Sequence, residues 1–125
     1  MTYGIHTSHA PQANGPYSQG AAAGRYVYVS GQIGIDPATD ALVSDTVDMQ
    51  LDQAITNIEA VLAEVKLTLE DVVKTTVFLT DLEDLPIVDM IWKTRFSSPR
   101  PARSCVEVRR LRDGARIEVE CVACR

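Results

Sequence analysis

A guanidinium, a thiol and a carboxylate alternate along one short stretch in the C-terminal part of the chain. Pro101 can begin a strand there, because its missing N–H group is tolerated at the first residue of a strand. The period of two along a strand then places three chemically active side chains on one face, namely Arg103, Cys105 and Glu107. The other face is predicted to join the core, through Ser104, Val106 and Val108.

Arg103 has two possible roles. A guanidinium held at the start of a rigid strand can bind a small carboxylate, because its planar fork donates two parallel hydrogen bonds. The alternative is a structural ion pair with a carboxylate of the chain, such as that of Glu118. These residues alone leave both interpretations open.

Two further candidates lie in the N-terminal third. Pro16 restricts the backbone before Tyr17 and so places a phenol at a defined position. Gly31 allows a strand bulge or the close approach of backbone to a ligand, with its N–H group available as a donor. The alternatives are a half-buried core tyrosine at Tyr17 and a simple strand bend at Gly31.

Two pairs of possible zinc ligands lie near the ends of the chain, His6 with His9 and Cys121 with Cys124. If the second pair lies on a strand, its two thiols point to opposite faces of the sheet. We therefore predict no metal site. Three cysteines in a chain expected in the cytoplasm also do not indicate a disulfide framework.

Length and composition are typical of one globular domain spanning residues 1–125, with 46% hydrophobic residues. The formal net charge of −5 argues against nucleic-acid binding, because phosphate contacts need clustered cations. No apolar run is long enough for a membrane span. The N-terminus has no basic segment followed by an apolar one, so we expect no signal peptide and a cytoplasmic location.

Hydrophobic spacing predicts one long helix over residues 47–65, with Ser44 or Asp45 as its N-cap. Its other face should be solvated, and carries Asp48, Gln50, Asp52, Gln53, Thr56, Asn57 and Glu59. A second helix is predicted from about Leu85 to Phe96, capped by Asp84. Its buried stripe comprises Val88, Ile91, Trp92 and Phe96.

Strands are predicted over residues 25–30, 72–79 and 116–122, in addition to the stretch after Pro101. Residues 1–15 indicate a loop or a loosely attached strand. Arg112–Gly114 is a hairpin turn signal before the last strand.

This order of elements predicts an α+β fold, a mixed sheet with two helices on one face. The other face of the sheet is half apolar, which suggests packing against other subunits.

Four segments, taken together and in this order, resemble the RidA (YjgF) family of small imine and enamine deaminases: Gly15–Gln19, Val29–Ile33, Val72–Leu79 and Pro101–Val108. The resemblance covers nearly the whole chain, and the last segment followed by Ile117–Glu120 is specific to the family. Two departures are Arg112, where the family often has a proline, and Arg100 before Pro101.

The resemblance implies a chorismate-mutase-like fold and a homotrimer with three clefts between subunits. By position, it implies that Arg103 binds the substrate carboxylate and that Glu118 orients a water. It also implies that Tyr17 lies at the cleft as a catalytic residue. The remaining substrate-binding positions would be Ser30, Gly31 and Cys105.

The implied reaction is hydrolysis of a short-lived 2-enamine or 2-imine acid, such as 2-aminoacrylate, to a 2-keto acid and ammonia. No metal or organic cofactor is expected, since an imine is already an activated electrophile. Cys105 could instead be a nucleophile, but no histidine lies near it in sequence to activate it.

Three other functions stay open at this point. One is a specialised deaminase, for example of 2-aminomuconate, and another is a non-catalytic binder of small acids such as 2-ketobutyrate. The third is an RNA-cleaving translation inhibitor, against which the acidic composition argues.

Overall fold

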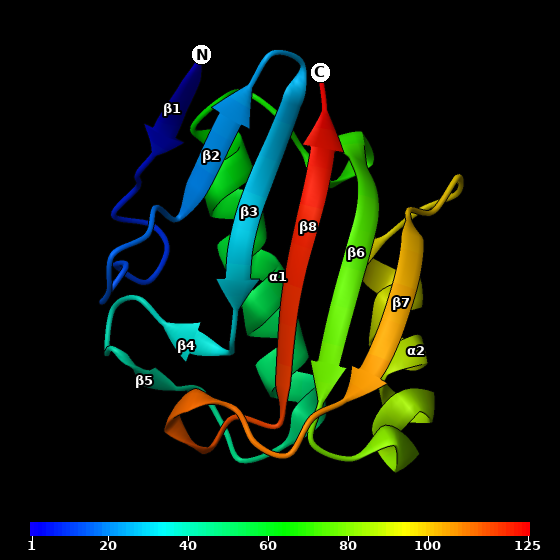
Figure 1. The fold of residues 1–125 in the computed structure, drawn as a ribbon. Helices are drawn as coiled ribbons and strands as arrows, with labels where there is room; N and C mark the ends of the chain where they lie inside the picture. Colours follow the sequence, from blue (N-terminus) through cyan, green and yellow to red (C-terminus); the bar gives the residue numbers. More distant parts are fainter.

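A mixed β-sheet and two helices form the two layers of the molecule (Figure 1). The structure is a computed structural model, and it describes residues Met1–Arg125. Helices α1 (Val47–Ala63) and α2 (Leu85–Arg95) both cover the same face of the sheet, and the other face is open. The predicted α+β architecture is therefore confirmed. Neither helix is long and apolar enough to cross a membrane.

The main sheet has six strands in the spatial order β1-β2-β3-β8-β6-β7. Their bounds are β1 Thr2–Ile5, β2 Gly20–Ala23, β3 Tyr26–Gln32, β6 Val72–Leu79, β7 Ala102–Glu107 and β8 Ile117–Cys124. Only the β6–β7 pair is parallel. A separate two-stranded sheet joins β4 (Ile35–Asp36) to β5 (Ala41–Leu42).

The predicted hairpin between the last two strands is wrong, because β6 lies between β7 and β8. The connecting residues form a short 3₁₀ turn, η3 (Arg112–Gly114), in which Asp113 and Gly114 have positive φ angles of 58° and 72°. The residues Arg112–Gly114 do indicate a turn, because turn formation depends on neighbouring residues. They do not indicate which strands pair, because strand order depends on contacts between distant segments. As a result, β7 is an edge strand with β6 as its only neighbour.

The sequence patterns did not predict β2, which consists of glycine and alanine. These residues have low strand propensity, so local composition favoured a loop. The strand forms because it pairs on both sides, with β1 and with β3.

The faces of β7 are reversed relative to the prediction. Ser104 and Val106 are exposed on the open face, whereas Arg103 and Cys105 are half-buried and point toward the helices. The register explains this, since Cys105 pairs with the fully buried Val77 of β6. The chemically active side chains therefore face the helix layer.

The apolar stripe of α1 is buried as predicted, but two residues assigned to its solvated face are also buried, Gln50 and Asn57. Asn57 donates to the carbonyl oxygens of Ile33 and Ile35, at 3.2 and 2.9 Å. These bonds attach α1 to the chain that follows β3. The helix begins after Thr46, not Ser44 or Asp45, and Thr46 makes no side-chain cap.

Helix α2 buries Val88 and Trp92, and Phe96 is buried directly after the helix ends, while Ile91 is only half-buried. Asp84 occupies the N-cap position of α2, as predicted, but its side chain makes no capping hydrogen bond. Asp81 caps the preceding 3₁₀ turn, η2 (Leu82–Asp84), through its side chain.

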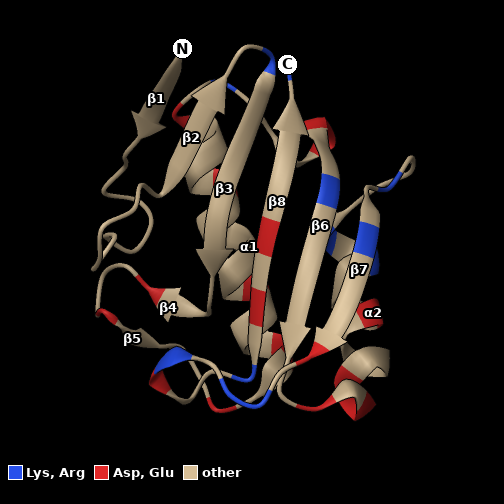
Figure 2. Ribbon diagram, viewed as in Figure 1, with Lys and Arg blue, Asp and Glu red and all other residues tan.

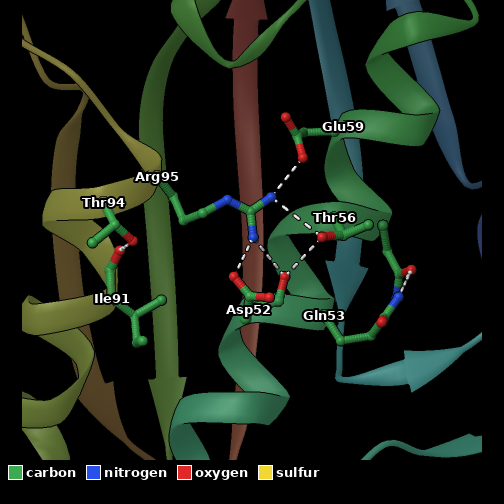
Figure 3. A network of polar contacts seen from close by, with 8 residues as sticks. Asp52, Gln53, Thr56, Glu59, Ile91, Thr94 and Arg95 are labelled. Atoms are coloured by element: carbon green, nitrogen blue, oxygen red, sulfur yellow. Dashed lines mark hydrogen bonds and ion pairs between the residues drawn. The ribbon is translucent and has the colours of Figure 1, made fainter.

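Arg95 ties α2 to α1 (Figure 3). Its guanidinium forms ion pairs with Asp52 and Glu59 and donates to the hydroxyl of Thr56. This network fixes α2 against α1.

Candidate functional site

A pocket of about 510 Å³ opens beside the ends of β3 and β8. Four of the predicted site residues line it: Tyr17, Ser30, Gly31 and Glu118. Three other charged residues complete the polar lining: Arg110, Arg112 and Glu120. The acidic residues belong to β8, and the basic residues to the segment between β7 and β8. Figure 2 shows acidic positions along β8 and basic positions in the connecting segment below that strand.

The β3 strand has a bulge between Val29 and Gln32, where its pairing with β8 shifts register. This register shift falls at Gly31, where the sequence left open a bulge, a close approach of backbone to a ligand or a simple strand bend. A Cβ atom on Gly31 would lie only 2.5 Å from Oε2 of Glu118. The absence of a side chain at Gly31 thus makes room for the carboxylate of Glu118.

Burial raises the pKa of the Glu118 carboxyl above its ordinary value, because desolvation disfavours the charged form. The positive charge of Arg112 opposes this shift, and the negative charge of Glu120 adds to it. A carboxyl with a raised pKa at a pocket wall is suited to proton transfer near neutral pH.

Tyr17 lies at the rim of the pocket and is 44% exposed. Its hydroxyl donates to Oδ1 of Asn14 at 3.3 Å and accepts from Nη1 of Arg112 at 3.4 Å. Ser30 donates its hydroxyl hydrogen to the carbonyl oxygen of Ser18 at 2.7 Å, which leaves its lone pairs available to a ligand.

Gln19 fixes the loop that carries Tyr17. Its buried side chain donates to the carbonyl oxygens of Thr7, Ala10 and Pro11 and accepts from the N–H of Thr7. The loop is therefore fixed by one buried amide as well as by the stiffness of Pro16. Sequence reasoning treated Gln19 only as part of a motif.

Arg103 lies apart from this pocket, on the helix side of the sheet. Its Nη2 is 2.8 Å from Oδ1 of Asp89 on α2, and its Cζ lies 5.1 Å from the ring centroid of Trp92. A structural carboxylate does pair with Arg103, but it belongs to Asp89 and not to Glu118. This ion pair is the only polar contact of the guanidinium within the chain, and its other edge is free.

Within one chain, the predicted site is not assembled. In the strand register, Arg103 lies opposite Thr75 of β6, and Thr75 lies opposite Cys121 of β8. Thr75 and Cys121 are both buried and face the helices, so Arg103 lies on the helix side as well. Glu118 alternates with the buried Ile117 and Val119, so it points to the open face. The two residues expected to act on one substrate therefore lie on opposite faces of the same sheet.

Cys105 shares the helix side with Arg103 and packs against the core. Burial, together with the nearby carboxylate of Asp89, raises the pKa of its thiol, although Arg103 and Lys74 oppose the shift. A thiol held protonated in this way is a poor nucleophile at neutral pH. Cys121 is buried on the same side, where burial raises its pKa to about 12, and Cys124 points to the open face.

Sequence reasoning missed Asp89 and gave Trp92 only a core role. Asp89 precedes Trp92 by three residues, which places both on one face of α2. That spacing was the available signal that Asp89 and Trp92 act together. Their partner, Arg103, could not be predicted from it, because the contact depends on β7 lying at the sheet edge beside α2.

Comparison with known protein families gives a match over residues 7–125, to the model described as Endoribonuclease L-PSP. The 2-iminobutanoate/2-iminopropanoate deaminase of Homo sapiens is 44% identical over 119 residues, which cover 95% of this chain and 87% of that protein. The protein of the same name from Salmonella typhimurium is 43% identical over 128 residues, covering 100% of this chain and 99% of that protein.

Solved structures agree with these matches. The crystal structure of the YjgF gene product from E. coli superposes with a TM-score of 0.93 at 39% identity, over 98% of each chain. E. coli TdcF with bound serine gives a TM-score of 0.92 at 36% identity, again over 98% of each chain. The protein therefore belongs to the endoribonuclease L-PSP family, the RidA (YjgF) family that its motifs resemble.

Proposed function

We propose that this protein is a cofactor-independent deaminase that hydrolyses short-lived 2-imino and 2-enamino acids, such as 2-aminoacrylate, to 2-keto acids and ammonia. The observation that carries the proposal is the half-buried Glu118, with its raised pKa, in a pocket beside Gly31. Relatives named 2-iminobutanoate/2-iminopropanoate deaminase support this choice of reaction class.

The proposal includes a homotrimer of chorismate-mutase-like architecture whose active sites lie between subunits. Arg103 and Glu118 face opposite sides of one sheet, so a substrate that touches both needs Arg103 from one copy and Glu118 from another. The position of β7 at the sheet edge favours this arrangement, since an edge strand is accessible to a neighbouring chain.

The free edge of the Arg103 guanidinium would bind the substrate carboxylate, while its other edge stays on Asp89. Contact with Trp92 and Asp89 holds the guanidinium in place before substrate binds. Cys105 would line the same side of the cleft, without forming a bond to the substrate.

In the reaction, an enamine first tautomerises to its imine. Glu118 accepts a proton from a bound water as the water oxygen adds to the imine carbon. The nitrogen of the resulting carbinolamine takes up a proton, the C–N bond breaks with its electron pair on nitrogen, and ammonia leaves. The carbinolamine hydroxyl loses its proton as the ketone forms. Tyr17, Ser30 and Gly31 would surround the reacting atoms at the cleft.

The test is a complementation experiment between two inactive variants, Arg103→Ala and Glu118→Gln. Each should turn over 2-aminoacrylate at least 100-fold more slowly than the wild type, measured by semicarbazide trapping and pyruvate formation. After the two are unfolded together and refolded, mixed trimers should regain about one quarter of wild-type activity, because one site in four receives both intact residues.

The control is each variant refolded alone, which should stay inactive. Wild-type activity of the Arg103→Ala variant would refute the carboxylate-binding role. If two inactive variants gave no activity after mixing, both residues would have to come from the same chain in each active site. That result would refute an active site shared between two subunits. A wild-type protein without any turnover would refute the deaminase function.

Two alternatives have support of their own. E. coli TdcF was crystallised with bound serine, which favours a binder of small acids; a wild-type protein that binds 2-ketobutyrate but turns over no imine would show this. The family model is described as an endoribonuclease. RNA cleavage at a constant specific activity through purification, and lost in Glu118→Gln, would support that function. A specialised deaminase of 2-aminomuconate type differs only in which imine is turned over.

A further inference from the structure

We infer that Arg112 is a second anion-binding group in this pocket and adapts the site to 2-imino dicarboxylates, four- or five-carbon acids with a carboxylate at each end. The inference rests on the deaminase function proposed above and specifies its substrate class. Arg103 would bind the carboxylate next to the imine carbon, and Arg112 the distal one.

The first observation is that Arg112 lines the pocket without a close ion pair, since Asp113 and Glu118 act on its charge only from beyond ion-pair distance. No carboxylate oxygen lies within ion-pair distance of its guanidinium, whereas Arg95 and Arg103 are both paired. Its Nη1 donates to Asn14 and to Tyr17, and its other nitrogens donate to no group of the chain. The charge of Arg112 is therefore available to a ligand.

The second observation is that Arg112 is positioned. The bond from Nη1 of Arg112 to Oδ1 of Asn14 is 2.7 Å long, and it ties the turn η3 that carries Arg112 to the loop before β2. Arg110 also lines the pocket, but no bond within the chain holds its side chain. A guanidinium that is held in place loses less conformational entropy when a carboxylate binds.

The third observation concerns charge. The chain carries a net charge of −5, which by itself would repel a dianion. In the pocket lining, Arg110 and Arg112 offset Glu118 and Glu120, so the lining is formally neutral. Arg112 is exposed. An exposed arginine in such a place can discriminate between one and two carboxylates, and this discrimination should weaken in high salt.

The chemistry places the protein after reactions that oxidise an acidic amino acid at its amine and release the imine. With 2-iminosuccinate as substrate, water adds to the imine carbon, the C–N bond breaks, and the products are oxaloacetate and ammonia. No oxidant or reductant is needed in this hydrolysis.

The experiment compares one monocarboxylate imine with two dicarboxylate imines, all made in the assay by amino-acid oxidases with catalase present. D-Alanine supplies 2-iminopropanoate, whereas D-aspartate and D-glutamate supply 2-iminosuccinate and 2-iminoglutarate. The measured quantity is the ratio of kcat/KM for the dicarboxylate to kcat/KM for 2-iminopropanoate. In Arg112→Gln this ratio should fall roughly tenfold, the effect of one charge-assisted contact.

Two further variants separate charge from structure. Arg112→Lys keeps the charge and should retain much of the ratio. Arg109→Gln removes a neighbouring exposed arginine that does not line the pocket, and should leave the ratio unchanged.

The outcomes distinguish the role of Arg112 from the deaminase function on which it rests. Turnover of 2-iminopropanoate with no turnover of either dicarboxylate, or an unchanged ratio in Arg112→Gln, would overturn the role of Arg112 and leave the deaminase function standing. An equal fall of the ratio in Arg109→Gln would also overturn it, because the effect would then reflect general charge. Turnover of no imine by the wild type would overturn both.

Discussion

At the scale of single residues, burial and the positive charge of Arg112 shift the pKa of the Glu118 carboxyl in opposite directions. Burial dominates and raises its pKa, so the folded chain favours the neutral acid. This group therefore contributes stability below its ordinary pKa, and the contribution is lost as the pH rises through the raised folded pKa. At neutral pH the charged Glu118 lowers stability while it serves the proposed chemistry.

Glu118→Gln should therefore be inactive but more resistant to heat than the wild type at pH 7. The gain should shrink as the pH falls from the raised pKa toward the ordinary value, because the wild-type side chain then becomes neutral as well. Thermal unfolding at several pH values measures this. A gain that grows toward acid pH would contradict the direction of the pKa shift.

The pH dependence of turnover follows from the same group. If the charged form of Glu118 accepts the proton, kcat should fall as the pH drops through the raised pKa, at a higher pH than an ordinary glutamate would give.

At the scale of elements, the bulge in β3 and the packing of α1 place the pocket walls. Gly31 leaves space for Glu118, and Gly34 lets the chain after β3 approach α1. The two glycines face different neighbours, since a Cβ on Gly31 would meet the end of a flexible side chain, whereas one on Gly34 would lie 2.5 Å from Cα of Gln50.

Gly31→Ala should reduce turnover by roughly tenfold or more while leaving the unfolding temperature nearly unchanged, because Glu118 can move aside but then leaves the position in which we propose that it acts. Gly34→Ala is the matched control for backbone crowding. It should destabilise the fold by about 1–3 kcal/mol, since the helix backbone cannot move in the same way. Equal destabilisation by both substitutions would contradict this distinction.

At the scale of the whole molecule, the open face of the sheet carries apolar side chains that no helix covers. Tyr26, Tyr28 and Val106 are 48%, 49% and 42% exposed there. Such a face is costly in water, and further copies of the chain in the proposed homotrimer would cover it.

Val106→Asp should therefore dissociate the trimer into folded monomers and remove deaminase activity, because burying an unpaired carboxylate is unfavourable. Light scattering gives the mass and circular dichroism the fold. The matched control is Met90→Asp, an apolar side chain 67% exposed on α2, which should leave the mass unchanged. A wild-type mass equal to that of one chain would contradict the trimer.

Local sequence determined most of the elements and the types of residue in the pocket. The stripe of α1 and the alternation in β3 and β8 follow from neighbouring residues, since periodicity reflects which side of an element is buried. The four residues Tyr17, Ser30, Gly31 and Glu118 could be predicted to share a pocket through the family resemblance.

Only the tertiary structure decided where Arg103 and Cys105 lie. Their face follows from the pairing of β7 with β6, and a register changed by one residue reverses the faces of a strand. The burial of Asn57 likewise depends on the distant carbonyl oxygens of Ile33 and Ile35. The burial of Gln50 depends on the distant N–H group of Arg116, which donates to Oε1 of Gln50. Strand order and hydrogen bonds between distant segments are set by the whole chain, and no local pattern encodes them.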